Sequence, residues 1–332
     1  MSEFILGVDI GYSNLVIVSG DADGDKPMDV TVMPAGAGPI ELMPQALMGG
    51  VSRDKAVRVV VDGKPWVAGV EPDRLQGWSR ELHSEYPFTD VYRSLFYTAL
   101  LISGRDVIDI LVTGLPVNQH MDTAFRERVA SSLKGEHQIT PKRTVTVKNV
   151  IVVPQPAGAY MNTIYSTDDD ELLEIVSEGR TVIIDPGFFS VDWVTLEGGE
   201  VRYQSSGTDL KAMSKVIEEA ALLIEADHGS SPCIERIERA IRGGKYEMIF
   251  LGQKISIDDY LKDASQKVAR AALVPMRTSL REEGTDVDVV ILAGGGAQAY
   301  KRAAADVFPR SRIIISKEPV AANAQGFWYC AK

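Results

Sequence analysis

Two short segments of the sequence share a pattern of residue types that suits phosphate and metal binding. The first contains Asp9-Ile10-Gly11-Tyr12-Ser13 and the second Asp185-Pro186-Gly187-Phe188-Phe189-Ser190, each between two apolar, β-rich runs. In both, a strand brings a carboxylate to a tight turn that glycine permits, and small polar groups follow. A carboxylate at a buried strand end is costly unless positive charge meets it, and hydrated Mg²⁺ on a nucleotide is a suitable partner. Either segment alone would pass for an ordinary Asp-Gly turn, but two matched copies favour a polyphosphate held between two domains.

The turns themselves and a third glycine-rich segment could contact phosphate oxygens. Gly11-Tyr12-Ser13-Asn14 and Gly187-Phe188-Phe189-Ser190 offer backbone N–H groups and hydroxyls, as turn nests do. Gly294-Gly295-Gly296 lies between a predicted buried strand and a helix start, where glycine allows a ligand to approach closely and the helix N-terminus favours anions. A plain tight turn explains this triplet equally well, and it matches neither the Walker A pattern nor the dinucleotide fingerprint.

Gln155 is a neutral amide held between two prolines at the end of a predicted strand. An amide fixed there could orient a water molecule for attack on a γ-phosphate without acting as the base. A polar residue in an ordinary strand-to-helix turn is the alternative explanation.

Length and composition indicate a two-domain globular protein. The chain has 332 residues, 45% of them hydrophobic and 24% charged, and a formal net charge of −11. The negative charge argues against a large nucleic-acid-binding face. Cys233 and Cys330 are far apart and the four histidines are scattered, so we expect a reduced, cytoplasmic protein without a histidine metal site. The sequence shows neither a signal-peptide pattern nor a long apolar run, so no membrane association is expected.

Strand and helix patterns alternate along the chain and predict an α/β protein with one mixed sheet in each half. Residues 34–56, rich in glycine and proline, are expected to be an irregular insertion. The expected strands are 3–9, 14–20, 29–33, 57–62, 65–68, 107–113, 144–153, 181–185, 190–196, 200–204, 246–250, 287–292 and 312–315. The expected helices are 89–104, 120–134, 169–178, 209–226, 233–242, 257–282, 297–307 and 319–329.

Taken in order, these segments resemble the actin-like ATPase superfamily, which has a duplicated ribonuclease-H-like core. The similarity is greatest to the ParM/StbA-like plasmid-partition proteins and their archaeal relatives. The aromatic form of the second segment is also similar to the PRTRC-locus subgroup. The resemblance rests on Asp9 to Asn14 as phosphate-1, Pro154 to Gly158 as connect-1, Asp185 to Gly187 onward as phosphate-2, Ala293 to Gly296 as the adenosine motif, and Ala322 to Phe327 as connect-2.

The resemblance implies an actin-like fold with a nucleotide cleft between two domains. Domain I would comprise residues 1–165 and 319–332, with an inserted subdomain at about 29–88, and domain II residues 166–318. Asp9 and Asp185 would hold Mg²⁺ through water, and Gln155 would place the hydrolytic water. The two hairpin turns would clasp the β- and γ-phosphates of ATP or GTP.

The resemblance also implies contacts to the rest of the nucleotide. Gly294, Gly295 and Gly296 would pack on the α-phosphate and adenosine. Lys215 with Glu218 or Glu219 would reach the ribose or base, although charge pairs on an exposed helical face explain these residues equally well.

The sequence departs from the family pattern at two places. Leu15-Val16 stand where the first hairpin often carries a phosphate-binding lysine, and Phe188 and Phe189 replace small residues in the second. These differences predict an ATPase with slow hydrolysis.

The resemblance implies a nucleotide-dependent filament former for plasmid or DNA segregation. With an acidic surface, such a protein would reach DNA through a separate DNA-binding adaptor. The alternatives are a non-polymerising nucleotide-binding regulator and a homologue of the cell-division or pilus type. A sugar kinase or a chaperone fits less well, because neither a substrate-side catalytic aspartate nor a peptide-binding domain is evident.

Overall fold

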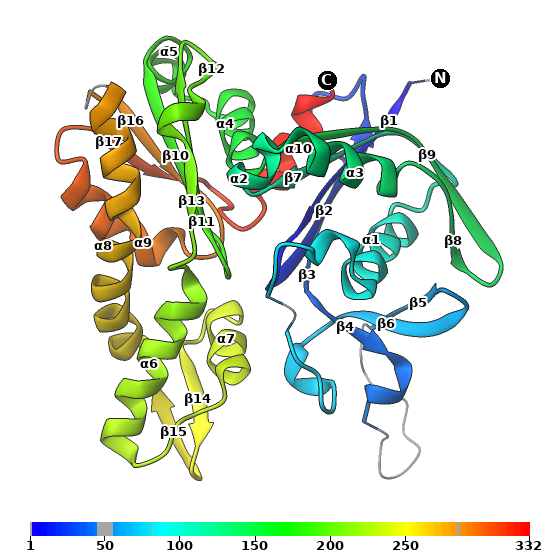
Figure 1. The fold of residues 1–332 in the computed structure, drawn as a ribbon, viewed down its shortest axis with the longest axis horizontal. Helices are drawn as coiled ribbons and strands as arrows, with labels where there is room; N and C mark the ends of the chain where they lie inside the picture. Colours follow the sequence, from blue (N-terminus) through cyan, green and yellow to red (C-terminus); the bar gives the residue numbers. More distant parts are fainter. Residues whose placement is uncertain (1, 45–55, 81, 284–285) are drawn as a thin grey trace. The chain divides into compact units, whose positions relative to one another are not determined.

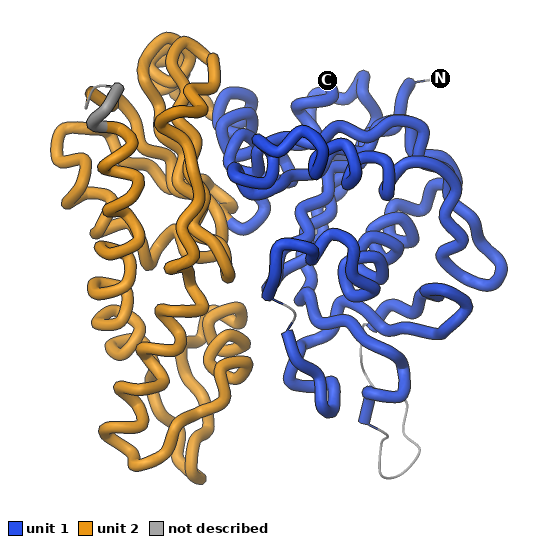
Figure 2. The backbone as a smooth tube through the Cα atoms, viewed as in Figure 1, with its two compact units in different colours: residues 1–166, 320–332 blue, residues 167–319 orange. Residues whose placement is uncertain are grey.

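The computed structural model describes residues 2–44, 56–80, 82–283 and 286–332. The chain forms two compact units, drawn in two colours in Figure 2. Unit 1 comprises residues 1–166 and 320–332, and unit 2 comprises residues 167–319.

Unit 1 is built on a six-stranded mixed sheet with the strand order β3-β2-β1-β7-β9-β8 (Figure 1). The hairpin β1–β2 and the strand β3 are antiparallel, whereas β1, β7 and β9 run parallel. The bounds are β1 Phe4–Ile10, β2 Asn14–Asp21, β3 Asp29–Pro34, β7 Val107–Leu115, β8 Gly135–Thr140 and β9 Arg143–Pro154.

Helices cover both faces of this sheet because its strands are apolar on both sides. On one face, Leu6, Val8 and Leu15 pack with side chains of α1 (Asp90–Ile102) and α3 (Thr123–Leu133). On the other, Ile5, Val16 and Val18 pack with α10 (Ala322–Cys330), which crosses α4 (Gln155–Ser166). The chain end therefore completes the core of unit 1. The short helix α2 spans Val117–Met121.

Unit 2 repeats the central part of this plan with the strand order β12-β11-β10-β16-β17. The hairpin β10–β11 is antiparallel, and β10 is parallel to β16. In the same way, β1 is antiparallel to β2 and parallel to β7 in unit 1. The strands are β10 Arg180–Pro186, β11 Val191–Glu197, β12 Glu200–Val201, β13 Gly207–Asp209, β16 Val289–Leu292 and β17 Arg312–Ile315. The helices are α5 Asp170–Glu178, α6 Met213–His228, α7 Ile234–Arg242, α8 Asp258–Glu283 and α9 Ala297–Val307.

The prediction of one mixed sheet in each half is incomplete, because each unit also holds a small antiparallel sheet. In unit 1 it has the order β4-β6-β5, with β4 at Gly36–Pro39, β5 at Val57–Val61 and β6 at Lys64–Val70. β4 lies within the expected irregular insertion 34–56, of which residues 45–55 fall outside the described residues. In unit 2 the small sheet is the hairpin of β14 (Glu247–Phe250) and β15 (Gln253–Ser256).

Two further element predictions were wrong for local reasons. The expected helix 120–134 is divided into α2 and α3, because the Asp122 side chain accepts a hydrogen bond from the Phe125 N–H and so starts a new helix. The expected strand 200–204 is only the two residues of β12, and a 3₁₀ turn at Tyr203–Ser205 follows. No helix among the described residues is long and apolar enough to cross a membrane.

Candidate functional site

The two hairpin turns predicted to bind phosphate close in the same way. The Gly11 N–H donates to the Asn14 carbonyl at 3.0 Å, and the Gly187 N–H donates to the Ser190 carbonyl at 2.9 Å. A Cβ atom at either glycine would lie only 3.3 Å or 3.1 Å from that same carbonyl oxygen. The internal repeat seen in the sequence is therefore also a repeat of backbone geometry.

Asp9 and Gln155 come together in unit 1, although they are far apart in sequence. Asp9 lies near the end of β1, and Gln155 is the first residue of α4, directly after β9. The Gln155 amide Nε2 donates to the Asp9 carboxylate Oδ2 at 3.4 Å. Gly114 in β7 lies between their strands, and a Cβ there would be 3.0 Å from the Gln155 Cα. Gly114 thus leaves room for Gln155, a role that only the three-dimensional packing reveals.

Asp185 and the glycine triplet form a second cluster in unit 2. Asp185 is 2% exposed at the end of β10. Gly294 has φ +70°, and a Cβ there would lie 2.0 Å from the Asp185 Oδ1 atom. The Gly296 N–H donates to the Pro186 carbonyl at 2.9 Å, and a Cβ at Gly296 would be 2.7 Å from that oxygen. Gly294 and Gly296 are therefore required by contacts with the end of β10, whereas a Cβ at Gly295 would meet nothing within 4 Å.

Asp192 is a second buried carboxylate in this cluster that the sequence reasoning missed. It lies directly opposite Asp185 on β11 and is also 2% exposed. Directly opposed residues share one face of a sheet, so the two carboxylates are neighbours. Asp192 accepts hydrogen bonds from the hydroxyls of Ser190 at 2.6 Å and Thr208 at 2.5 Å.

The position of Asp192 in an otherwise apolar, buried strand was a signal available in the sequence. In the first hairpin, the residue opposite Asp9 is Val16, so only unit 2 carries the carboxylate pair. Two neighbouring buried carboxylates favour binding of a cation or of a proton.

The phosphate-2 turn is held in place by α6. The N–H groups of Met213 and Ser214 donate to the carbonyls of Gly187 and Phe188 at 3.1 and 2.8 Å. The Phe188 ring packs, partly buried, against the apolar core of unit 2, and Phe189 is half-buried. Phe188 therefore stabilises this turn by packing against the core of unit 2.

The phosphate-1 turn is anchored by aromatic contacts. The Tyr12 ring stacks on Tyr86 with centroids 4.3 Å apart, and its hydroxyl donates to the His83 carbonyl at 2.8 Å. Burial raises the pKa of Tyr12 to about 12. Its ring is thus committed to contacts within unit 1, while Ser13 and Asn14 are half-buried beside it.

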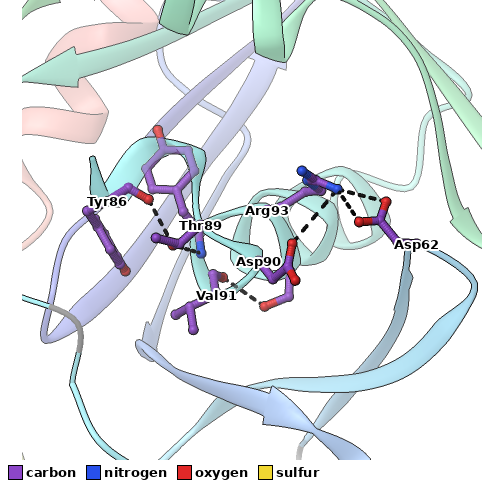
Figure 3. A network of polar contacts seen from close by, with 8 residues as sticks. Asp62, Tyr86, Thr89, Asp90, Val91 and Arg93 are labelled. Atoms are coloured by element: carbon purple, nitrogen blue, oxygen red, sulfur yellow. Dashed lines mark hydrogen bonds and ion pairs between the residues drawn. The ribbon is translucent and has the colours of Figure 1, made fainter.

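A polar network fixes the segment that carries Tyr86. The Thr89 hydroxyl donates to the Tyr86 carbonyl at 2.9 Å and accepts from the Tyr92 N–H at 3.2 Å, which caps the start of α1 (Figure 3). One turn further on, Arg93 forms hydrogen bonds to both carboxylate oxygens of Asp62 at 2.8 and 2.9 Å.

Family models identify the chain in both halves. The model described as the N-terminal domain of actin-like proteins matches residues 7–158, and the model described as the C-terminal domain of the archaeal MreB-like actin homologue matches residues 183–304. The chain is an actin-like protein. A search of curated proteins finds no match.

Solved structures support the same fold for this actin-like protein. The crystal structure of the archaeal actin homologue Ta0583 has 18% sequence identity and a TM-score of 0.75, and the match covers 100% of this chain and 99% of that one. Ta0583 in complex with ADP gives 17% identity, a TM-score of 0.75 and the same coverage. A 15-stranded ParM filament from Clostridium botulinum gives 17% identity and a TM-score of 0.71, covering 99% of this chain and 98% of that one.

A cavity of about 320 Å³ opens beside Gly295 in unit 2 of this actin-like protein. Its walls come from the start of α6, from α8 and from α9, so it adjoins the glycine triplet. The lining residues include Met213, Leu261, Lys262, Arg270, Gln298 and Arg302. The lining also contains Asp258, which is paired with Lys262 at 2.5 Å. A cavity with apolar walls and charged groups of both signs suits a polar ligand with a flat apolar part.

Lys215 and Glu218 form a charge pair on the surface of α6, which was the alternative interpretation of these two residues. The Lys215 Nζ donates to the Glu218 carboxylate at 2.7 Å across one turn of α6, and both side chains are about half exposed. Glu219 accepts from Lys267 of α8, also at 2.7 Å.

The described residues contain no group of three or more His, Cys, Asp or Glu side chains able to hold a metal ion. A metal at the carboxylates of either unit would therefore complete its coordination with water or ligand oxygens. Mg²⁺ accepts such a site, because it keeps several waters and needs only one or two carboxylates.

Proposed function

We propose that this actin-like protein binds a magnesium nucleoside triphosphate and uses it to drive its own assembly into filaments. The observation that carries this proposal is the pair of matched turns, each beside a carboxylate at a strand end. Asp9 and Gln155 accompany the turn in unit 1, and Asp185 with Gly294 accompanies the turn in unit 2.

Each group has a defined part in the proposed site. The backbone N–H groups of the two turns and the Ser13 hydroxyl would bind the β- and γ-phosphates, and Asp9 and Asp185 would hold Mg²⁺ through water. Bound Mg²⁺ would neutralise charge on the phosphate oxygens. Gln155, positioned by its hydrogen bond to Asp9, orients the attacking water. The cavity beside Gly295 takes the nucleoside, with ATP as the expected ligand and GTP as the competitor.

The proposed biological role is segregation of plasmid or other DNA. It is supported by the similarity in fold to ParM, and the net charge of −11 favours contact with DNA through an adaptor protein. Direct, salt-sensitive DNA binding by the purified protein would contradict the adaptor. A nucleotide-binding regulator that never assembles is the competing function.

Nucleotide-dependent assembly is measured by light scattering and pelleting with Mg²⁺ and ATP, GTP or ADP. We expect the triphosphate to give assembly and Asp185→Asn to abolish it through loss of Mg²⁺-dependent binding. Binding without any change in scattering would favour the non-polymerising regulator.

Gln155→Ala tests the hydrolytic role separately from binding. We expect nucleotide affinity to be kept and phosphate release to fall by about 100-fold, the scale typical of losing a group that aids proton transfer or positions water. Gln138→Ala, the same substitution at an exposed position of the edge strand β8, is the matched control and should change neither. Phosphate release by Gln155→Ala at the wild-type rate would remove Gln155 from this role.

A further inference from the structure

The short connection between α7 and β14, residues 243–246, ends in a tyrosine with a strained backbone (Figure 1). Tyr246 has φ +50°, in the left-handed region that bulky L-residues rarely adopt. Gly244, two residues earlier, has φ +64°, which glycine adopts without a steric penalty. A glycine or an asparagine in place of Tyr246 would form the same backbone with less strain, so the turn alone does not explain a tyrosine here.

Packing does not explain the tyrosine either. Ile241, at the other side of the connection, packs against the core of unit 2, whereas Tyr246 is 36% exposed. The Tyr246 side chain makes no hydrogen bond and no ring contact with any residue that the structure describes. Its backbone, by contrast, is fixed, because the Tyr246 carbonyl accepts a hydrogen bond from the N–H of the buried Ile257 at 2.9 Å. A strained residue with a fixed backbone and an uncommitted side chain is a candidate for contact with a ligand.

Tyr246 lines the cavity of about 320 Å³ that opens beside Gly295. This volume is in the usual range for a small-molecule site. Other parts of the wall are apolar, with Leu261 of α8 and Ala299 and Ala303 of α9. Because a single cavity borders both Gly295 and Tyr246, a ligand held at the glycine triplet can reach the tyrosine ring.

The charged side chains of this cavity are largely compensated. Lys262 is paired with Asp258, and Arg270 is paired with Asp306 at 2.9 Å. Arg302 of α9 also lines the cavity and forms no ion pair within the described part of the chain. A wall with apolar residues, an exposed aromatic ring and little net charge suits a flat, neutral group better than a polyphosphate.

We propose that Tyr246 holds the base of the bound nucleotide by stacking on it. The inference rests on the proposed nucleotide binding and names the residue that positions the base. An aromatic side chain stacks on any base, because every base has a π face, so adenine and guanine should both be held. The phosphates would then lie toward the glycine triplet and the start of α9, where a helix N-terminus favours anions.

Isothermal titration calorimetry of the full chain, below the concentration at which it assembles, tests this contact. The ligands are ATP, GTP and inorganic tripolyphosphate, each with Mg²⁺, and tripolyphosphate has the phosphates without a base. We expect Tyr246→Asn to weaken binding of ATP and GTP by about tenfold, as for the loss of one base–aromatic stack, and to leave tripolyphosphate binding unchanged. Tyr246→Phe keeps the ring and should bind all three ligands like the wild type.

Leu251→Asn is the matched control in the same unit. Leu251 also has positive φ, at +48°, and an exposed side chain, but it does not line the cavity. Both variants replace a strained bulky residue with asparagine, which tolerates positive φ. Without nucleotide, both should therefore unfold at the wild-type temperature or above it, and only Tyr246→Asn should lose affinity for ATP and GTP.

The outcomes separate the inference from the proposed function. Wild-type affinity of Tyr246→Asn for ATP and GTP would overturn the inference and leave the proposed nucleotide binding standing. An equal loss of affinity for tripolyphosphate would also overturn it, since the effect would then lie on the fold or the phosphate site. A wild type that binds none of the three ligands would overturn the proposed function and the inference with it.

Discussion

The absence of a side chain at Gly294 decides where the Asp185 carboxylate can lie. Gly294 combines positive φ with a Cβ position that the Asp185 oxygen already occupies, whereas Gly295 has open space around it. The sequence predicted that all three glycines serve a ligand, but it could not separate those required by packing from the one that borders a cavity. Gly114 escaped the prediction for the same reason, since its neighbour Gln155 is brought to it only by the order of the strands.

Gly294→Ala should destabilise unit 2 and displace Asp185. Strain at positive φ costs about 1–2 kcal/mol, and relief of the overlap with Asp185 adds to it. We expect a lower free energy of unfolding in urea and weaker Mg²⁺-dependent nucleotide binding. Gly295→Ala is the matched control and should unfold like the wild type. Equal unfolding free energies for the two variants would contradict the packing argument.

At the scale of elements, patterns of apolar residues predicted most helices and strands, but they missed the 12-residue helix α4 and several short strands. The expected helix 297–307 and strand 312–315 coincide with α9 and β17, and helix 89–104 is confirmed as α1. The strand β8 was missed, because Gly135–Thr140 is a short, mostly polar edge strand. The glycines of β4 (Gly36–Pro39) predicted a loop, and this segment is a strand only because it pairs with β6.

The helices α4 and α10 cross at glycines that belong to two of the sequence motifs, although the motifs alone do not show that the helices touch. A Cβ at Gly326 of α10 would lie 1.6 Å from the Gly158 carbonyl oxygen, and one at Gly158 would lie 2.4 Å from the Asn323 oxygen. The two helices are therefore in backbone contact at glycines of the connect-1 and connect-2 motifs.

Gly326→Ala should force these helices apart and lower the free energy of unfolding of unit 1 by about 1–3 kcal/mol, the usual range for overpacking. Urea unfolding followed by tryptophan fluorescence, to which the buried Trp328 of α10 contributes, measures this. Gly104→Ala is a useful comparison, because it lies in open space at φ +68° and should cost only the backbone strain, about 1 kcal/mol. A smaller effect at Gly326 than at Gly104 would contradict the close crossing.

At the scale of the whole molecule, the two units differ in their buried histidines. His120 and His137 are 8% and 9% exposed, and both belong to unit 1. Their Nε2 atoms lie 3.2 Å from the Val152 carbonyl and 3.0 Å from the Leu133 carbonyl. Burial lowers the pKa of both rings below the usual value of 6.5, and for His120 the nearby Arg126 lowers it further.

These shifts predict that unit 1 loses stability in mild acid before unit 2 does. Each histidine is neutral in the folded unit at a pH where the unfolded chain already binds a proton, so the stabilisation is present above pH 6.5 and is lost as the pH falls through the lower, folded-state value. Differential scanning calorimetry between pH 7.5 and 5 should show the transition of unit 1 moving to lower temperature relative to that of unit 2. The double variant His120→Gln and His137→Gln should reduce this relative shift, and His228→Gln in unit 2 is the control. A relative shift as large in the double variant as in the wild type would place the acid sensitivity on other groups.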